Sequence, residues 1–452
     1  TQSMSQEEYK TSTANPSGAA EKPVEEIQPR KTDKHIWGIY IALCIISVIE
    51  LYSASSHEVT ASNVFAPVIR HVTFLLLGLV IMLTLQKIHY KKFFRWTYIF
   101  ALMSGVAMVY TLLFGDYING ARRSFTLLFF TIQPSEMVKI SAVLLIAAIL
   151  SRNQMRKAAD VTPRGLILVA VCVGIAGGML VIHGLTNTAL LMGISFSMML
   201  VGGVSLRKLV YVGLAYGLIF AVFWGGRHLI GGNNEEVMAV TEPMQVPGTS
   251  VIVGASDTGS SSSFGRSDTW QSRLKSWKLN KFNDPVTEKN QQEMYSFMAQ
   301  ANGGVTGVGP GNSRETARLP LAFSDYIYAI VIEELGLVGG IFVLVLYLWL
   351  LARAGQVAKR CQTAFPAFLV IGMAVFIVFQ ALFHMAIVTG VFPVSGQPLP
   401  LISKGGTSIL ITSLALGIML SVSRFAARKG DKTEIKEEMQ ALPDEIAAVN
   451  PI

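Results

Sequence analysis

Long apolar runs recur along the whole chain, and they constrain its fold more than any other feature of the sequence. A helix needs about 20 consecutive apolar residues to cross the hydrocarbon core of a membrane, so we predict about ten spans. They lie at Ile36–Ala54, Val68–Leu85, Phe94–Phe114, Pro134–Leu150, Gly165–Ile182, Thr188–Val204, Leu209–Trp224, Tyr326–Ala352, Phe365–Val391 and Thr407–Phe425. Because the chain is 51% apolar and only 15% charged, we expect an all-α polytopic membrane protein.

Basic residues predict the orientation of these helices. Lys and Arg gather in alternate loops, in "PRKTDK", "QKIHYKKFFR", "SRNQMRKAADVTPRG", "SLRK", "ARAGQVAKR" and "SRFAARKGDK". The positive-inside rule then places both termini in the cytoplasm, with flexible tails at residues 1–34 and 430–452 around a membrane domain at residues 35–429. The net charge of +8 fits basic loops beside anionic lipid, and no nucleic-acid partner is expected.

Some cations break this rule. Arg122 and Arg123 in "NGARRSF", Arg70 at the start of the second span, and Lys404 all fall on the predicted outer side. Short outer loops tolerate some cations, which is the simpler explanation. Guanidinium groups, however, bind phosphate oxygens bidentately. Outer cations at headgroup depth therefore suit a lipid-linked phosphate or pyrophosphate.

Charged residues also fall inside two of the predicted spans. Glu136 and Lys139 are three residues apart in the fourth span and share one helix face. They form either a structural ion pair or a polar pocket that receives a headgroup, since charges within a span are costly and need a partner or a cavity. Glu333 and Glu334 in the eighth span offer the same choice, and one of them could neutralise Lys139 or an outer arginine.

A large outer loop, residues 225–324, separates the seventh and eighth spans. Its middle is rich in Ser and Gly, and glycines at positions 303–311 allow tight turns and a close approach of the backbone to a ligand. Asp284 precedes Pro285 among several cations. An Asp-Pro pair is most often a turn former, but an outer carboxylate beside phosphate-binding cations also suits a transferase acting on a lipid-linked substrate.

Other functional classes lack their sequence signatures here. The chain contains no HExxH, GxSxG or Walker-type motif, so neither metalloprotease, serine-hydrolase nor nucleotide-driven chemistry is indicated. No nucleotide or organic cofactor is expected.

Four motifs in a fixed order resemble the SEDS family (shape, elongation, division and sporulation), which includes FtsW and RodA. They are "NGARRSF…IQPSEMVK", "NDP", "GGVTGVGPGNS…LP…SDYIYAIVIEELGLVG" and "FPVSGQPLPLISKGGTS". The "GPGNS" stretch is more similar to the FtsW division branch. The resemblance runs from the first span to the tenth.

This resemblance implies a peptidoglycan glycosyltransferase that polymerises lipid II on the outer face of the bacterial cytoplasmic membrane, at the division septum. Asp284 would be the general base that activates the acceptor sugar's 4-hydroxyl, with inversion and loss of undecaprenyl pyrophosphate. A divalent cation, Mg²⁺ or Mn²⁺, would be an optional cofactor, with Asp284 as its candidate ligand. The substrate-binding set would be Arg70, Arg122, Arg123, Glu136, Lys139, Asp325, Gln397, Ser403, Lys404 and Thr407.

The implied partners are lipid II, the growing glycan on undecaprenyl pyrophosphate, a class B penicillin-binding protein with transpeptidase activity, and other divisome or elongasome membrane proteins. The chain departs from the family at three places. "VTEKNQQ" follows Pro285 where a Gly-rich segment is usual, Lys404 replaces a common aromatic residue, and "VIHGLTNTAL" lacks a Pro-Asp-Leu-Gly pattern. Lys404 is therefore either an added phosphate contact or a partner for a helix C-terminus.

Two other functions fit many of the same features. A lipid II flippase would use outer arginines and intramembrane charges, but it would need cations reachable from both faces. A non-catalytic scaffold for the penicillin-binding protein would need only a docking surface. Neither function requires Asp284, so that residue distinguishes them from the polymerase.

Overall fold

The computed structural model describes residues 31–55, 66–118, 121–127, 130–154, 160–231, 277, 285–287, 290–319 and 322–426. Nearly all of the two predicted tails lies outside these residues. The long helices are α1 (Lys34–Ser55), α2 (Ala66–Leu85), α3 (Lys91–Phe114), α4 (Pro134–Asn153), α5 (Pro163–His183), α6 (Leu185–Val201), α7 (Leu206–Gly231), α11 (Ile327–Arg360), α12 (Ala364–Val388) and α13 (Gly406–Phe425). Each coincides with one predicted span.

The polytopic helical class is thereby confirmed. Eight of these helices are long and apolar enough to cross a membrane. The other two are α6, an apolar helix of 17 residues, and α7, which has 26 residues. The number of crossings and the side of each loop stay predictions.

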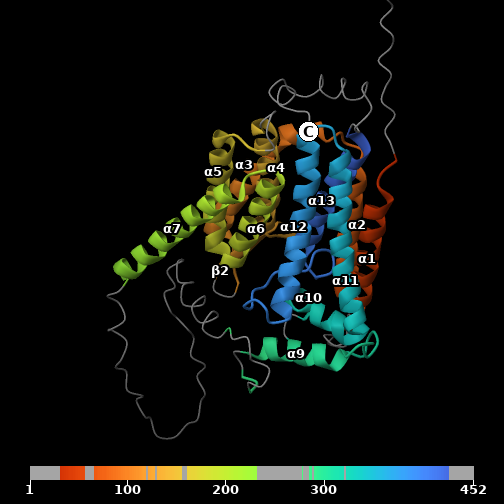
Figure 1. Cartoon of the computed structure of the whole chain (residues 1–452). Coiled ribbons are helices and arrows are strands. Elements are labelled where there is room, and N and C mark those ends of the chain that lie inside the picture. The colour runs from red at the N-terminus through yellow and green to blue at the C-terminus, as the bar shows by residue number, and fades with distance from the viewer. Residues whose placement is uncertain are drawn as a thin grey trace, which may run out of the picture.

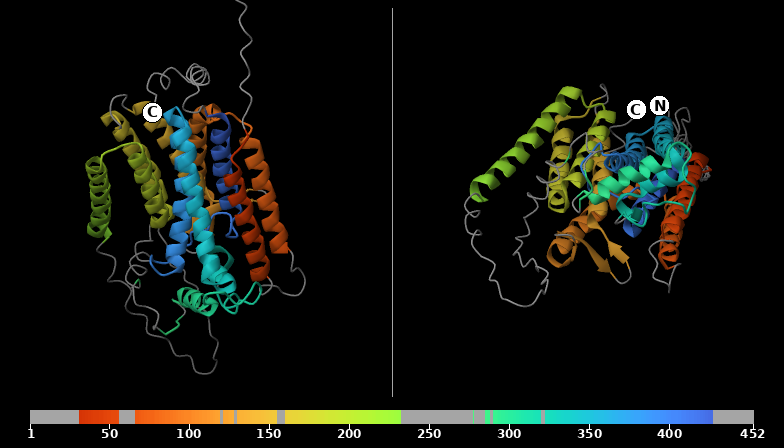
Figure 2. Two further views of the ribbon diagram at one scale, coloured as in Figure 1. Left: turned by 45° about the vertical axis from the view of Figure 1, so that its right-hand side comes forward. Right: turned by 90° about the horizontal axis from the view of Figure 1, so that it is seen from below.

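The long helices run side by side as a bundle, with α7 leaning away at one edge (Figure 1). We call one end of the bundle the basic end, because it carries the loops predicted to be cytoplasmic, and the other the loop end. The start of α1 and the ends of α11 and α13 meet at the basic end. There the Asp33 carboxylate forms an ion pair with Arg353, and Asp33 N donates to Ser423 Oγ at 3.4 Å. Helix α9 (Gln291–Gly303) lies across the loop end in both side views (Figures 1 and 2).

Helices α4 and α12 form the centre of the bundle, and 83% of the apolar window of each is buried. Gly372 of α12 lets the helices pack closely. A Cβ there would lie 2.7 Å from Met198 Cε of α6 and 2.8 Å from Val143 Cγ1 of α4. Small residues allow such approaches between helices in lipid, where packing rather than water exclusion drives association.

A small antiparallel sheet at the loop end was not predicted from the sequence. Its strands, β1 (Asp116–Ile118), β2 (Ala121–Leu127) and β3 (Phe130–Ile132), follow the order β1-β2-β3. The strands are short and join α3 to α4, in a segment that the sequence analysis treated as a connecting loop. They place the motif arginines on a β-hairpin within the predicted outer loop.

Helix α11 is broken at Gly336, where φ is +73° and ψ is −178°. The break frees backbone groups, which the glycine-rich turn after α9 satisfies: Val308 N donates to Glu333 O at 3.0 Å, and Leu337 N donates to Gly304 O at 3.0 Å. Gly307, with φ +81°, approaches the break so closely that a Cβ would lie 2.5 Å from Gly336 N. The glycines thus approach the α11 backbone, where the sequence suggested a ligand.

Candidate active site

The N-termini of α4 and α13 meet at the loop end through Thr407. Its Oγ1 donates to the carbonyl oxygen of Thr131 at 2.6 Å and accepts from Gln133 N at 3.3 Å. Pro134 opens α4 because a first-turn residue needs no intrahelical N–H bond. Two helix N-termini therefore point to one region, and each carries partial positive charge from its unpaired N–H groups. Such a region favours an anion.

Glu136 and Lys139 form an ion pair within α4, just inside this junction. Lys139 Nζ lies 2.7 Å from Glu136 Oε1, and the two side chains are 0% and 2% exposed. The ammonium also lies 6.0 Å from the ring centre of Phe376 on α12. Glu136 Oε2 is buried and has no hydrogen-bond partner among the described residues. The pair is thus closed to solvent. Glu136 Oε2 is the atom through which the pair could accept a hydrogen bond from a neighbouring polar group.

A turn between α12 and α13 packs against the short helix α10 (Ala322–Asp325). Ser403 Oγ donates to Ser324 O at 2.7 Å and accepts from Leu399 N at 2.7 Å. Lys404 N donates to Phe323 O at 2.9 Å, and its ammonium lies 5.1 Å from the Phe323 ring centre. The structure therefore brings Ser403 and Lys404 together with α10. Ser403 holds the backbone, which is a positioning role.

Asp325 and Gln397 lie at the same place. Gly396 faces the Asp325 carboxylate so closely that a Cβ would be 2.7 Å from Oδ2. The carbonyl oxygen of Gln397 lies 2.6 Å from His384 Nδ1, whereas its side-chain Oε1 is buried without a partner among the described residues. Asp325 thus shares one region of the loop end with a segment that follows it by 72 to 82 positions and carries Gln397, Ser403, Lys404 and Thr407.

The two adjacent arginines of the predicted outer loop, Arg122 and Arg123, lie on strand β2. Arg122, on β2, donates through Nη1 to Leu112 O at 3.0 Å and also to Leu113 O, so it caps the C-terminus of α3. Its side chain is exposed. For Arg123 the structure describes the backbone, within β2. Part of the Arg122 guanidinium therefore has a structural use at the end of α3.

Arg70 is exposed on α2. It lies one helical turn from Phe74, whose ring packs on Gly406 at the start of α13. Arg70 is therefore near the α13 N-terminus.

Asp284 lies outside the described residues, but the turn that follows it is visible. Asn290 Oδ1 accepts from Thr287 N at 2.6 Å, and Asn290 Nδ2 donates to Pro285 O at 3.0 Å. This turn opens α9, which is fixed to the end of α12 because Gln300 Nε2 donates to Val388 O at 2.9 Å. The chain immediately after Asp284 is thus tied to a helix that lies across the loop end.

The structure corrects the suggested partners of Glu333 and Glu334. Both are buried, but neither neutralises Lys139, whose partner is Glu136. Glu333 accepts from Ser313 Oγ at 2.5 Å and Arg314 N at 3.1 Å. Glu334 accepts from Ser53 Oγ. Glu333 therefore holds the glycine-rich segment against α11 directly, whereas Glu334 acts through Ser53 of α1, whose Oγ accepts from Gly311 N at 2.9 Å. Beside them, a hollow of about 550 Å³ opens between two side-chain amides and two guanidinium groups (Asn302, Asn312, Arg314 and Arg318).

Sequence reasoning missed Glu50 of α1. Its side chain is 0% exposed, and both carboxylate oxygens lack a hydrogen-bond partner among the described residues. Its signal was present, because Glu50 is an acid inside the first apolar run, and such residues are expensive and usually functional.

The described residues offer no group of three or more His, Cys, Asp or Glu side chains arranged to hold a metal ion. Asp284, the candidate ligand, is outside that part of the chain. The divalent cation stays a prediction.

Comparison with known proteins gives consistent matches over most of the chain. The family model described as "Cell cycle protein", FTSW_RODA_SPOVE, matches residues 33–428. A probable peptidoglycan glycosyltransferase FtsW of Geobacter metallireducens is 30% identical over 392 residues, covering 85% of this chain and 92% of the relative. Stage V sporulation protein E of Bacillus subtilis is 26% identical over 410 residues, covering 88% and 99%.

Solved structures share the fold. A chain from a peptidoglycan synthase complex, described as coordinating polymerization and crosslinking, has a TM-score of 0.64 at 23% identity, covering 88% of this chain and 99% of that one. The rod shape determining protein RodA of Thermus thermophilus has a TM-score of 0.56 at 21% identity, covering 88% and 98%.

Proposed function

Because this chain belongs to the FtsW, RodA and SpoVE family of cell cycle proteins, we propose that it is a peptidoglycan glycosyltransferase that polymerises lipid II into glycan strands. The family resemblance predicted from the four motifs is confirmed. The names of the relatives agree with the predicted activity, and the FtsW name agrees with a role in septal synthesis. The match over residues 33–428 carries the proposal, because it includes both the helical core and the outer-loop motifs.

The geometry of the loop end supports binding of a lipid-linked pyrophosphate. The α4 and α13 N-termini converge at Thr407, with Lys404 beside them and Arg70 on the neighbouring helix. Developing charge on a departing pyrophosphate is best stabilised by dipoles and cations that are already in place. In this proposal these groups bind the pyrophosphate, while Glu136 and Lys139 order the junction from within the bundle.

Asp284 is the proposed general base. It takes the proton from the acceptor sugar's 4-hydroxyl as that oxygen attacks the anomeric carbon of the donor, and the bond to undecaprenyl pyrophosphate breaks. One carboxylate suffices because pyrophosphate leaves without protonation, unlike the neutral leaving groups that need a second acid. The tie between the Pro285 turn and α9 supports this role by holding the chain next to Asp284 at the loop end.

The proposal includes a location and a partner. We place the chain in the bacterial cytoplasmic membrane, at the septum, with its loop end outside. We propose a class B penicillin-binding protein as the partner that crosslinks the new strand, since a solved relative of the same fold belongs to a peptidoglycan synthase complex.

The test is polymerisation of labelled lipid II by purified protein, with its penicillin-binding protein and Mg²⁺ or Mn²⁺ present. We expect Asp284→Ala to lower the rate by about 100-fold or more, the usual contribution of a general base. Asp268→Ala, which removes another carboxylate of the same loop, is the control and should polymerise normally. Thermal unfolding establishes that both variants are folded.

The other outcomes separate the alternatives. Equal polymer from wild type and Asp284→Ala would keep the enzyme and reject its base. No polymer from the wild type, with the partner bound, would reject the polymerase, and a lipid II flipping assay in liposomes would then decide between a flippase and a scaffold.

A further inference from the structure

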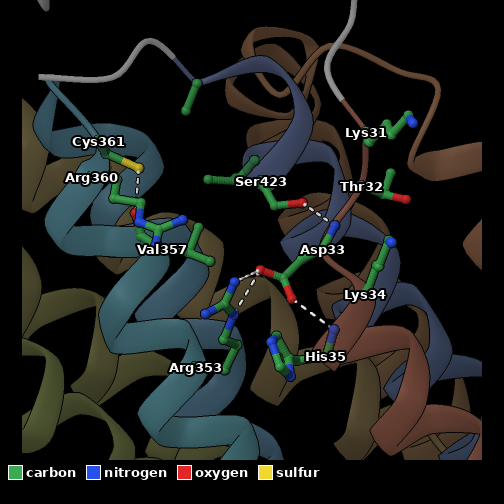
Figure 3. A pocket seen from close by; sticks show the side chains of 12 residues that line it. Lys31, Thr32, Asp33, Lys34, His35, Arg353, Val357, Arg360, Cys361 and Ser423 are labelled. Atoms are coloured by element: carbon green, nitrogen blue, oxygen red, sulfur yellow. Dashed lines mark hydrogen bonds and ion pairs between the residues drawn. The ribbon is translucent and has the colours of Figure 1, made fainter. Parts of the chain in front are cut away.

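A basic hollow lies at the end of the bundle opposite the proposed active site. Its volume is about 240 Å³. Three segments line it: the residues that lead into α1, the last turns of α11, and the end of α13 (Figure 3). Four of the side chains are cations (Lys31, Lys34, Arg353 and Arg360). Among the residues that the structure describes, Asp33 is the one acidic side chain in the lining.

The single acid is already neutralised. Asp33 Oδ2 accepts from Arg353 Nε at 2.8 Å and lies 2.7 Å from Arg353 Nη2, while Oδ1 accepts from His35 N at 2.9 Å. Burial favours the neutral acid, but Arg353 and the first-turn amides outweigh it and lower the pKa of Asp33 below its usual value. The Asp33–Arg353 pair is therefore a charge-balanced floor, and the other three cations have no further acid among the described residues of the lining to balance them.

Those three cations stand around the floor. Figure 3 shows Arg360 on the α11 side, Lys31 and Lys34 on the α1 side, and Asp33 with Arg353 between them. All three are exposed. Basic residues in the last turn of a helix also complement its dipole, which explains Arg360 alone. It does not explain why two lysines from another segment face the same hollow.

The depth of the hollow matches the headgroup layer. The candidate membrane span of α1 begins at Lys34 and that of α11 ends at Arg360, so the hollow lies at the boundary of the membrane. One helical turn from Arg353, Trp349 is 48% exposed, and its ring centre lies 5.7 Å from that of His35. Exposed Trp residues typically mark the interface between hydrocarbon and headgroups. The cations are thus positioned at the level of lipid phosphates.

We propose that this hollow binds a phosphate-bearing anion, supplied by the headgroup of an anionic phospholipid in the leaflet at the basic end. Basic pockets between membrane helices at the cytoplasmic side bind such headgroups. A bound phosphate would link the residues that lead into α1 with the end of α11, which already meet here through the Asp33–Arg353 pair. A soluble phosphate has the same chemistry, and the experiment separates the two sources.

The experiment measures the thermal unfolding midpoint of the full chain in neutral detergent against ligand concentration. The probes are dioctanoyl phosphatidylglycerol, dioctanoyl phosphatidylcholine and inorganic phosphate. The test variant is Lys34→Gln/Arg360→Gln, which leaves the Asp33–Arg353 floor intact. The control is Arg207→Gln/Lys359→Gln, which removes two exposed cations of the same end that do not line the hollow.

We expect phosphatidylglycerol to raise the midpoint of the wild type and the control, and phosphatidylcholine to have no effect. The test variant should need about thirtyfold more phosphatidylglycerol for the same shift. Each basic residue near a membrane surface contributes about 1 kcal/mol to the attraction of an anionic lipid, and the variant lacks two of them. An equal response to inorganic phosphate would support the site and assign it to soluble phosphate. Equal responses to both lipids, or an unchanged response in the test variant, would overturn the proposal.

Discussion

The buried Glu136–Lys139 pair yields the sharpest prediction of stability. Replacing Glu136 by Met leaves the Lys139 ammonium in a site where its side chain is 0% exposed. The ammonium can no longer be balanced there, and water cannot reach it. We therefore expect Glu136→Met and Lys139→Met each to be strongly destabilising, whereas the double variant is close to the wild type.

The magnitude follows from the geometry. At 2.7 Å and an effective dielectric constant of about 20, the direct attraction is about 6 kcal/mol. Most of this offsets the cost of removing both charges from water. Breaking such a pair by removing one member costs about 3–5 kcal/mol, whereas replacing both by apolar groups of similar volume is close to neutral. The expected interaction energy between the two substitutions is therefore several kcal/mol.

The assay is thermal unfolding of the four purified proteins in one detergent at one heating rate, since membrane proteins often unfold irreversibly. Each single variant should lose roughly 5 °C or more. The control is Asp160→Asn, which breaks the Asp160–Lys208 pair, where the side chains are 24% and 37% exposed. An exposed pair is worth less than about 1 kcal/mol. If the double variant is as unstable as the worse single variant, the reasoning from the buried charge is wrong.

Three further predictions concern other parts of the fold. Gly307→Ala should destabilise the protein by more than about 3 kcal/mol, because the new Cβ would lie 2.2 Å from Glu334 O of the α11 backbone. In the same unfolding assay Gly311→Ala, at φ +83° with no atom within 4 Å, should lose only about 1 kcal/mol. Burial and the charges of the nearby lysines lower the pKa of His89 to about 4. The free energy of unfolding should therefore fall more steeply between pH 6.5 and pH 4 in the wild type than in His89→Phe, and parallel curves would refute this. Thr407→Val leaves Gln133 N without its partner and should slow lipid II polymerisation, whereas Thr407→Ser keeps the hydroxyl and should restore it.

The sign of the His89 effect follows from linkage. Its ring is neutral in both states above about pH 6.5. Between that pH and about 4, the unfolded chain binds a proton that the folded chain does not, so acid favours unfolding. Carboxylates also titrate in this range, and the difference between the two proteins removes their contribution.

The helices of the bundle could be predicted from the sequence because each is a local property. An apolar run of sufficient length must become a helix in lipid, where every backbone N–H and C=O group needs an internal partner. The alternation of basic loops is also a property of the sequence alone, and it predicts the orientation of the helices without reference to packing. The shared face of Glu136 and Lys139 follows from helical spacing alone, and their ion pair at 2.7 Å confirms it. The glycines of positions 303–311 likewise indicated close backbone contact.

The tertiary structure decided which partner each residue has. Glu333 could have paired with Lys139 on sequence grounds, but its carboxylate accepts a hydrogen bond from Ser313 Oγ. Spacing along the chain could not show that Arg122 caps α3, because that contact depends on how β2 folds back. The meeting of Thr407 with Gln133 joins residues 274 positions apart. Helix formation depends on neighbours along the chain, whereas a site depends on which helix ends pack together, and only the folded bundle specifies that.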